Sequence, residues 1–512
     1  MRKLIQLFIA LFIVCRIEAQ SVKVTFDAPS SDLIISRNIY GHFAEHLGRC
    51  IYDGFWVNDS LNVAKKDRLR LDVIDALKKI KIPLLRWPGG CFADEYHWSD
   101  GIGPRNQRPA RVNSNWGMVK EDNSFGTHEF LELCTLLNCE PYIAGNVGSG
   151  TTQEMANWIE YLNYDGSSTL ADLRRKNGRE KPWKVSYWGV GNESWGCGGE
   201  MTPEYYSTQF KQYASFCKNY PGAPLRKIAS GSNGEDYNWT EVCMKNIPNW
   251  QMWGISMHYY TVTGTWQKKG SATQFAEDEY FTALKKCLHI EDLINKHSAI
   301  MDKYDPQKKV ALVVDEWGIW TDPEPGANAG ILYQQNSMRD ALIAASTLNI
   351  FNNHCDRVKM ANLAQIVNVL QSLILTNKEK MVLTPTYYVF DFYKVHQDSK
   401  LLPVHLSSPE YKFGNESIAA INISASQDST GNIHLTIANL DPTKKISINP
   451  SLGNLKWKKA EARVLSSAKF TDVNSFTEPE KIKPVTFNDY KVSGDQLTVN
   501  MPPMSVVVIT LN

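Results

Sequence analysis

Residues 185–193 read Val-Ser-Tyr-Trp-Gly-Val-Gly-Asn-Glu, a short apolar run that ends on the carboxylate of Glu193. Residues 310–316, Val-Ala-Leu-Val-Val-Asp-Glu, follow the same pattern and end on Glu316. Short apolar runs rich in β-branched and aromatic residues favour buried strands. Hydrolysis of a glycosidic bond uses one carboxylic acid to protonate the leaving oxygen and one carboxylate on the opposite face of the sugar. Two glutamates at strand ends therefore indicate a sugar-cleaving site.

Six further apolar runs of strand length lie in the same part of the chain, separated by stretches of helix length. Helical spacing of apolar residues is clear in residues 68–79 and 127–137. Alternating strands and helices predict a parallel sheet covered by helices, and eight strands close it into a (β/α)₈ TIM barrel. In that fold, catalytic residues lie where strands end, so Glu193 and Glu316 would follow the fourth and seventh strands. The predicted strands are residues 38–43, 83–87, 141–145, 185–190, 228–231, 254–258, 310–314 and 358–363.

The pattern changes beyond about residue 380. Helical spacing disappears, and short alternating runs such as residues 433–437 and 505–511 replace it. Alternation of this kind is typical of antiparallel sheets with one buried face. We therefore predict a catalytic barrel at residues 38–380 and a C-terminal antiparallel β-sandwich at residues 381–512, which the alternating segment within residues 21–37 would join.

The first twenty residues belong to neither domain. Arg2 and Lys3 precede an apolar run at residues 4–15, and residues 17–19 form an imperfect cleavage site. This arrangement is typical of a secretory signal peptide and predicts export to the periplasm or the cell exterior. The run is too short to span a bilayer, and no later stretch is long enough, so no membrane span is expected in the mature chain. An N-terminal membrane anchor and lipidation of Cys15 are the alternatives.

Composition excludes some classes of function. The formal net charge is only +1, so the chain lacks the excess of basic residues that is typical of nucleic-acid-binding proteins. The ten cysteines are scattered without a Cys-x-x-Cys pair, so they indicate neither a disulfide framework nor a zinc ribbon, and the sequence cannot pair them. Fifteen tryptophans suit sugar stacking and a large core equally well, so a non-catalytic carbohydrate-binding protein is a second hypothesis.

A competing motif stands at residues 42–46, His-Phe-Ala-Glu-His, which matches the H-x-x-E-H pattern of a zinc peptidase family. In such enzymes both histidines bind zinc from one face of a helix. Here a strand-like segment precedes the motif and Gly48 follows it at once. A helix that presents both histidines is therefore poorly supported, and hydrogen-bonded residues at the barrel mouth are the simpler interpretation.

Five longer motifs stand in order at residues 40–49 (YGHFAEHLGR), 85–92 (LRWPGGCF), 189–193 (GVGNE), 314–317 (VDEW) and 361–365 (ANLAQ). Together they resemble the α-L-arabinofuranosidases of glycoside hydrolase family 51, and the resemblance runs from about residue 38 to the C-terminus. It implies a retaining, exo-acting hydrolase in which Glu316 is the nucleophile and Glu193 the acid/base. It also argues against the zinc motif, because the segment around Glu45 lines the sugar pocket in that family.

The resemblance also assigns supporting residues. Arg86 would favour the ionised form of Glu316, and Asn192 would bind the sugar 2-hydroxyl. Tyr260 would hold the nucleophile, with Tyr259 as its rival if the alignment is off by one. Neither a metal nor an organic cofactor is expected, since the two carboxylates supply acid, base and nucleophile. The remaining residues expected to contact the arabinosyl hydroxyls are Glu45, Cys91 and Gln365, while Trp98 and Trp195 are candidates for stacking on sugar.

The resemblance is less specific about the natural substrate and the assembly. It implies an arabinose-containing polysaccharide or oligosaccharide, either arabinan or arabinoxylan. An endo-acting β-glycanase on the same barrel is the alternative function. Family members are often hexamers, so a homo-oligomer is expected.

Overall fold

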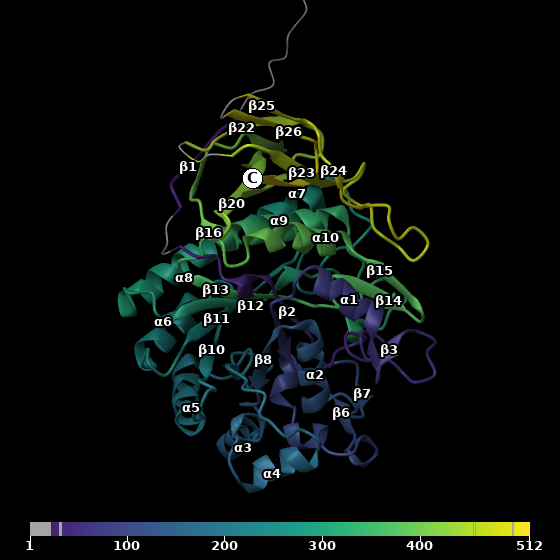
Figure 1. Ribbon diagram of the computed structural model, residues 1–512, viewed down its shortest axis with the longest axis vertical. Helices are drawn as coiled ribbons and strands as arrows, with labels where there is room; N and C mark the ends of the chain where they lie inside the picture. The colour runs from purple at the N-terminus through teal and green to yellow at the C-terminus, as the bar shows by residue number, and fades with distance from the viewer. Residues whose placement is uncertain (1–21, 30–32, 454, 456, 494–495) are drawn as a thin grey trace, which may run out of the picture.

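The computed structural model describes residues 22–29, 33–453, 455, 457–493 and 496–512 (Figure 1). Residues 1–20, for which a signal peptide is predicted, lie outside the described residues. A barrel ringed by helices forms the lower part of the view, and β-sheets form the upper part. In the described part of the chain, no helix is both long and apolar enough to cross a membrane.

Eight parallel strands close into the barrel, as predicted. Neighbouring strands are joined in chain order, and the last strand pairs with the first through Asn362 with Gly41 and Leu363 with His42. The strands are β2 (Gly41–Phe43), β5 (Leu84–Trp87), β8 (Glu140–Gly145), β9 (Tyr187–Val190), β10 (Arg226–Asn233), β11 (Gly254–Thr261), β12 (Ala311–Ile319) and β13 (Val358–Leu363).

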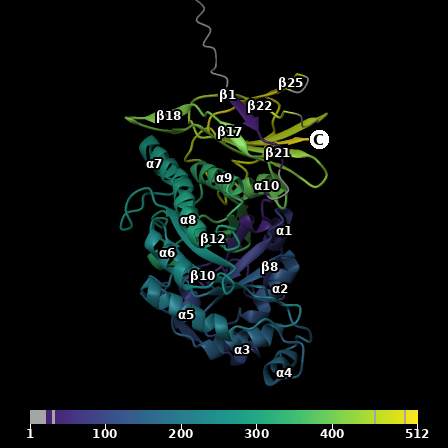
Figure 2. The ribbon, with the colours of Figure 1, turned by 90° about the vertical axis from the view of Figure 1, so that its left-hand side faces the viewer.

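Helices cover the outside of the barrel (Figures 1 and 2). The predicted helix at residues 127–137 begins at Thr127, where the Glu129 carboxylate accepts the N–H of Gly126 and so caps the first turn. The helices are α1 (Leu71–Lys79), α2 (Thr127–Leu137), α3 (Thr152–Asn163), α4 (Thr169–Lys176), α5 (Pro203–Phe216), α6 (Tyr237–Asn246), α7 (Glu277–Leu288), α8 (Ile290–Tyr304), α9 (Met338–Asn353) and α10 (Pro385–Tyr393).

Two larger sheets form the upper part, one of five and one of six strands. Their pairings are antiparallel, except that β1 (Val22–Phe26) runs parallel to β22. The five-stranded sheet has the order β17 (Val404–Leu406), β1, β22 (Ile446–Ser451), β26 (Gln496–Met501), β25 (Tyr490–Ser493). The six-stranded sheet has the order β16 (Lys400–Leu401), β20 (Ile421–Gln427), β21 (Ile433–Asn439), β27 (Ser505–Leu511), β23 (Ala460–Ser466), β24 (Val485–Thr486).

Four two-stranded ribbons complete the described strands. The ribbon of β6 and β7 belongs to the long loop after β5, which returns to the mouth of the barrel. The pairs are β3 (Lys65–Lys66) with β4 (Leu69–Arg70), β6 (Arg111–Asn113) with β7 (Val119–Glu121), β14 (Ile374–Asn377) with β15 (Lys380–Leu383), and β18 (Glu410–Phe413) with β19 (Glu416–Ala419).

Helix α9 joins the two parts of the molecule. It contacts β12 of the barrel on one side and β20 and β21 of the six-stranded sheet on the other. Because it is covered on both sides, residues 338–352 are all buried. An amphipathic pattern is therefore absent from this helix, as expected for one enclosed between two layers.

Apolar and aromatic side chains fill the lower barrel interior and carry the polar site above them. The side chains of this layer come from six of the eight strands, β5, β8, β9, β10, β12 and β13. The Tyr142 hydroxyl, in this layer, donates to Asp315 Oδ2 at 2.6 Å, so the packed layer also positions a carboxylate of the site. The layer consists of Leu84, Tyr142, Tyr187, Ile228, Ala311, Val313 and Met360.

Candidate active site

A tight turn after β9 presents Glu193. The residue adopts a left-handed backbone with φ of 39°, and Gly191 before it has φ of 87°. Non-glycine residues rarely adopt this conformation unless their surroundings hold them there. The N–H groups of Gly196 and Gly198 donate to the Glu193 carbonyl at 2.7 and 3.1 Å. The turn's own hydrogen bonds therefore fix the direction of the Glu193 side chain.

Irregularities in β12 place two consecutive carboxylates in the same site. In a regular strand, Asp315 and Glu316 would point to opposite faces. The register of β12 shifts against β11 between Ser256 and His258, and against β13 between Val314 and Trp317. Such a shift re-aims side chains locally. Both carboxylates consequently reach Arg86, with Nε–Oδ2 of Asp315 at 3.7 Å and Nη1–Oε2 of Glu316 at 3.1 Å.

The structure places the two glutamates predicted to be catalytic, Glu193 and Glu316, close to each other. One carboxylate oxygen each of Glu193 and Glu316, and a ring nitrogen of His258, all lie within 4.8 Å of one another. Retaining glycosidases hold their carboxyl groups about 5 to 5.5 Å apart, whereas inverting enzymes need roughly 6.5 to 9.5 Å to admit a water. The close approach is typical of the retaining arrangement.

Two side chains orient Glu316 by hydrogen bonds. Arg86 donates through Nη1 at 3.1 Å, and the Tyr260 hydroxyl donates to Oε1 at 2.7 Å. Arg86 also donates through Nη2 to Asn192 Oδ1 at 2.5 Å, which links the turn of the first glutamate to the second. Tyr259 instead donates to the carbonyl of Lys286. Of the two tyrosines considered from the sequence, Tyr260 is the one that contacts Glu316.

His258 bridges the carboxylates and was not identified from the sequence. Its Nδ1 lies 2.8 Å from Glu193 Oε1, and its Nε2 lies 3.0 Å from Asp315 Oδ1. With both nitrogens facing carboxylate oxygens, the ring is satisfied best as imidazolium. Burial disfavours that charge, but the negative charge of Glu316 and the hydrogen bonds to Asp315 and Glu193 outweigh it and raise the pKa of His258 to about 10. The ring is therefore a fixed cation at neutral pH.

Burial raises the pKa of Glu193 above that of an ordinary glutamate, and repulsion from Glu316 adds to the effect. The hydrogen bond and charge of His258 act in the opposite direction. A raised pKa keeps a proton on the carboxyl group closer to neutral pH, as a general acid requires. The environment of Glu193 thus suits proton donation.

Glu45 lines the site, and Gln365 Nε2 donates to its Oε2 at 2.9 Å. The other oxygen accepts the N–H of Phe92 at 3.1 Å and Nε1 of Trp116 at 2.8 Å. Burial, followed by repulsion from Glu316, raises the pKa of Glu45 to about 7. Trp116 is a further site residue that no sequence pattern singles out, because it comes from the distant loop between β6 and β7.

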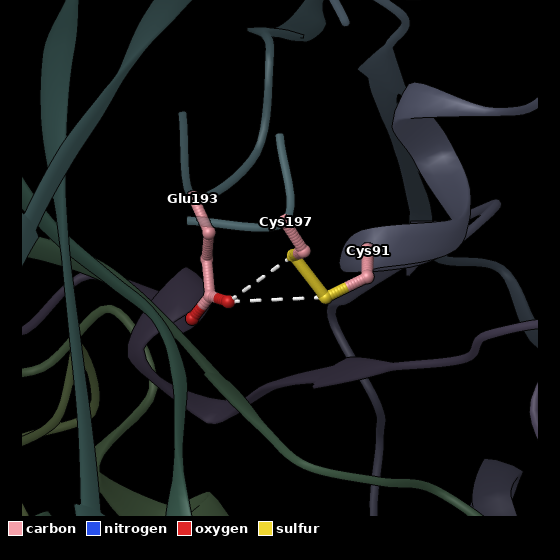
Figure 3. A group of neighbouring side chains, drawn as sticks. All are labelled: Cys91, Glu193 and Cys197. Atoms are coloured by element: carbon pink, nitrogen blue, oxygen red, sulfur yellow. Dashed lines mark hydrogen bonds between the residues drawn. A yellow bond between two sulfur atoms is a disulfide. The ribbon is translucent and has the colours of Figure 1, made fainter. Parts of the chain in front are cut away.

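Cys91 lies in the site, but as half of a disulfide with Cys197 (Figure 3). The Sγ atoms of Cys197 and Cys91 lie 3.5 and 3.9 Å from Glu193 Oε2. A disulfide sulfur carries no proton, so these contacts can be hydrogen bonds only when the Glu193 carboxyl group is protonated and donates. Cys91 thus has no thiol to offer a sugar hydroxyl, and its sulfur faces the acid.

Asp94 anchors the turn that carries Glu193. Its carboxylate accepts the N–H groups of Val147, Gly148 and Asn192 at 2.7, 2.8 and 3.0 Å. Burial raises the pKa of Asp94 to about 7, against the effect of these three donors. Asp94 and Cys91 both belong to the 3₁₀ helix η2 (Cys91–Asp94), so one short element holds the Glu193 turn by two links.

The two histidines of the H-x-x-E-H motif do not converge. His42 packs its ring against Phe390, with centroids 4.5 Å apart, and its pKa is lowered by burial to about 3. His46 Nδ1 lies 2.8 Å from Glu121 Oε2. Neither belongs to a cluster of metal-ligating side chains among the described residues. The motif therefore lacks the geometry of a zinc peptidase.

Aromatic side chains line the mouth of a cavity of about 260 Å³ above the glutamates. Trp266 and Trp320 meet edge to face at 5.7 Å, and the Lys269 ammonium lies over both rings. Trp195 also lines the cavity, whereas Trp98 stacks on Trp158 in the core. The lining residues are Glu45, Cys91, Trp116, Glu193, Trp195, Asn233, His258, Tyr260, Trp266, Glu316 and Trp320.

Comparison with known proteins agrees with this geometry. Residues 76–278 match the family model described as α-L-arabinofuranosidase 1 domain, and residues 315–505 match the α-L-arabinofuranosidase C-terminal domain. The GH51 arabinofuranosidase from Xanthomonas axonopodis pv. citri has a TM-score of 0.94 and 46% identity, covering 96% of this chain and all of that one. The Thermotoga maritima α-L-arabinofuranosidase, in its arabinose complex, has a TM-score of 0.81 and 30% identity, covering 96% and 99%.

A Bacteroides ovatus protein corrects the prediction of export. It is 52% identical over 493 residues, covers 96% of both chains, and is named an intracellular exo-α-L-arabinofuranosidase. A relative this similar that acts inside the cell contradicts the periplasmic or extracellular location predicted from residues 1–20. A basic and apolar N-terminus is a pattern of composition, and it does not by itself establish where a protein acts.

The relatives decide between the hypotheses left open by the sequence. Identity of 52% over nearly the full length, together with two matched domain models, far exceeds what a shared barrel fold alone would give. The binding-protein and β-glycanase alternatives are therefore set aside. The chain belongs to the α-L-arabinofuranosidases of glycoside hydrolase family 51.

Proposed function

We propose that the chain releases terminal non-reducing arabinofuranosyl residues by double displacement, with Glu316 as nucleophile and Glu193 as acid/base. A Glu316 oxygen attacks the anomeric carbon while the bond to the leaving oxygen breaks and takes the Glu193 proton. Water then attacks the glycosyl-enzyme, gives its proton to Glu193 and frees Glu316. The observation that carries this proposal is the close approach of the two carboxylates.

The neighbours of each carboxylate support its role. Arg86 and Tyr260 both donate to Glu316, which leaves its carboxylate oriented for attack. The raised pKa of Glu193 favours the protonated form required of an acid. The imidazolium of His258 fixes the Glu193 side chain through a 2.8 Å contact. Glu316 is thus oriented for attack and Glu193 is suited to proton donation, as the first step needs.

Three residues are suited to holding the sugar. Arg86 fixes the Asn192 amide through its oxygen, so the amide nitrogen is the group available to the 2-hydroxyl. Glu45 lines the cavity and accepts from Gln365, so this pair supplies polar groups suited to the sugar hydroxyls. A cavity of about 260 Å³ fits one terminal pentose better than an internal stretch of polysaccharide, which supports exo action.

The stereochemical outcome tests the mechanism directly. We expect the first-formed arabinose to have the α configuration of the substrate, because two inversions restore it. Proton NMR during the first minutes of hydrolysis, before mutarotation, measures this. Initial formation of the β anomer would contradict the double displacement and require a water between the carboxylates.

The acceptor side is suited to the remainder of an arabinan or arabinoxylan fragment, and Trp266 is its most exposed aromatic residue. Its side chain is 54% exposed, and it sits at the cavity mouth. A stacking platform for carbohydrate contributes mainly to binding of the unit beyond the cleaved bond.

We therefore expect Trp266→Ala to lower kcat/KM about tenfold on arabino-oligosaccharides, equivalent to roughly 1.4 kcal/mol, and much less on 4-nitrophenyl α-L-arabinofuranoside. Steady-state kinetics on both substrates measures the ratio. Trp250→Ala is the matched control, since Trp250 is 82% exposed and does not line the cavity. Equal losses on both substrates would place Trp266 outside the acceptor site.

The family resemblance also leads us to propose a homo-oligomer, with a hexamer as the expected form. Sedimentation velocity of the purified chain measures its mass, and a monomer at micromolar concentration would contradict the proposal.

A further inference from the structure

The Cys91–Cys197 disulfide is unlike the other cysteines of the described chain. Seven described cysteines are free; six of these are buried, and Cys139 is partly exposed. Cys197, in contrast, is exposed, and it is bonded to Cys91, which lines the catalytic cavity. Accessible disulfides are the ones that external thiols reduce most readily. A dithiol reductant can therefore be expected to reach this bond.

The disulfide faces a third group that can bind a metal. One ligand atom each of Cys91, Cys197 and Glu193 lies within 4.8 Å of the others, and Figure 3 shows both sulfurs turned toward the carboxylate. Two thiolates and a carboxylate are a donor set for Zn²⁺, at about 2.3 Å for sulfur and about 2.0 to 2.2 Å for oxygen. While the sulfurs are bonded to each other they cannot act as thiolates, so the set exists only after reduction.

Hydrogen bonds would keep the three groups close once the S–S bond is gone. Asp94, on the same short helix as Cys91, accepts the N–H of Asn192 at 3.0 Å. On the other side, the Cys197 turn closes through the N–H groups of Gly196 and Gly198, which donate to the Glu193 carbonyl. Neither link passes through a sulfur atom. The cysteines therefore remain on neighbouring, anchored segments in the dithiol form.

We propose that reduction of the Cys91–Cys197 disulfide converts the catalytic cavity into a binding site for a thiophilic divalent cation such as Zn²⁺, ligated by both sulfurs and Glu193. A dithiol gives two electrons and two protons to the S–S bond and itself becomes a cyclic disulfide. When the metal binds, the two thiols release their protons to solvent. The cation coordinates the carboxylate of Glu193, which then cannot donate the catalytic proton. The reduced, metal-bound enzyme is therefore inactive, while the oxidised enzyme is insensitive to the metal.

The test compares two redox forms of the full chain. One sample is reduced with dithiothreitol and desalted without oxygen, and the other is left oxidised. Both are dialysed against micromolar ZnCl₂, and bound zinc per chain is measured by atomic emission. Hydrolysis of methyl α-L-arabinofuranoside is measured in parallel, each sample relative to its own metal-free rate. The reduced form should bind one equivalent and lose on the order of 100-fold in rate, with recovery on adding EDTA.

Variants assign the ligands. Cys197→Ser and Cys91→Ser should each weaken zinc binding by the reduced chain at least about tenfold, because a hydroxyl is a poor substitute for thiolate. Cys139→Ser is the matched control, since Cys139 is a partly exposed free cysteine that does not line the cavity. It should bind zinc and lose activity as the unmodified chain does.

Three outcomes would overturn parts of the proposal, and they are distinguishable. Failure of the reduced chain to bind zinc refutes the site. Equal inhibition of the oxidised form assigns the effect to Glu193, His258 and Glu316, the other cluster of potential ligands, and also refutes it. The inhibitory step alone rests on the proposed function of Glu193. Cysteine-dependent binding without inhibition would therefore preserve the metal site and overturn the role of Glu193 as acid.

Discussion

Replacement of Glu316 by alanine is expected to lower kcat on every arabinofuranoside by about 10,000-fold or more, because no other described carboxylate can form the covalent intermediate from that position. The loss should be as large for an activated aryl glycoside as for an oligosaccharide. Both substrates need the nucleophile, whatever their leaving group. Steady-state assays with 4-nitrophenyl α-L-arabinofuranoside and an arabino-oligosaccharide measure the two rates.

Azide provides the sharper readout for this variant. Alanine leaves space beside Arg86 and Tyr260, where Glu316 now accepts their hydrogen bonds, and an anion can enter that space. We expect azide to restore turnover of the aryl glycoside and to give the β-configured glycosyl azide by a single inversion. Glu291→Ala, at an exposed glutamate on α8, is the control and should keep full activity. An α-configured azide would show that Glu316 is not the nucleophile.

Replacement of Glu193 by alanine should instead discriminate between leaving groups. An alkyl or sugar leaving group needs a proton as the bond breaks, so kcat/KM for such substrates should fall by about 100-fold to 10,000-fold. A 4-nitrophenyl group needs little assistance, so its kcat/KM, which reports the first step, should fall far less. Its kcat should still drop, because the second step has lost its base. Equal losses in kcat/KM on both substrates would contradict the assignment.

The pH dependence of the unmodified enzyme follows from the same group. Burial and the charge of Glu316 raise the pKa of Glu193, and the acid acts only while protonated. Activity on poor leaving groups should therefore be retained below that pKa and lost as pH rises through it. In Glu193→Ala, this basic limb should disappear from the profile of kcat/KM. Its persistence would assign the limb to another group.

The barrel could be predicted from the sequence because its signals are local. Each strand is a short apolar run and each is followed by a segment of helix length, so the eight-strand count needs no knowledge of contacts. The carboxyl ends of parallel strands meet at one face, which is why Glu193 and Glu316 could be placed together from their positions alone.

The rest of the site depends on contacts between distant segments. Trp116, Asp94 and Cys197 are brought to the site only through loop conformations that strand and helix periodicity does not encode. His258 did offer a signal, because it ends an apolar run as the two glutamates do, but nothing local shows that it bridges two carboxylates. The irregular register of β12 turns both Asp315 and Glu316 into the site. A sequence pattern that assumes strict alternation of side chains cannot predict such a shift.

The pairing of β1 has a consequence for how the chain matures during synthesis. This strand, at Val22–Phe26, finds its partners in β17 and β22, which begin at Val404 and Ile446. All eight barrel strands, the last of which ends at Leu363, are synthesised after β1 and before β17 and β22, so β1 has exposed edges throughout that time. The barrel strands are thus complete while this leading segment is still unpaired, and β1 gains its partners only after most of the chain has emerged. During this interval the unpaired edge of β1 can pair with the wrong strand. The risk ends once β22 has been synthesised and pairs with β1.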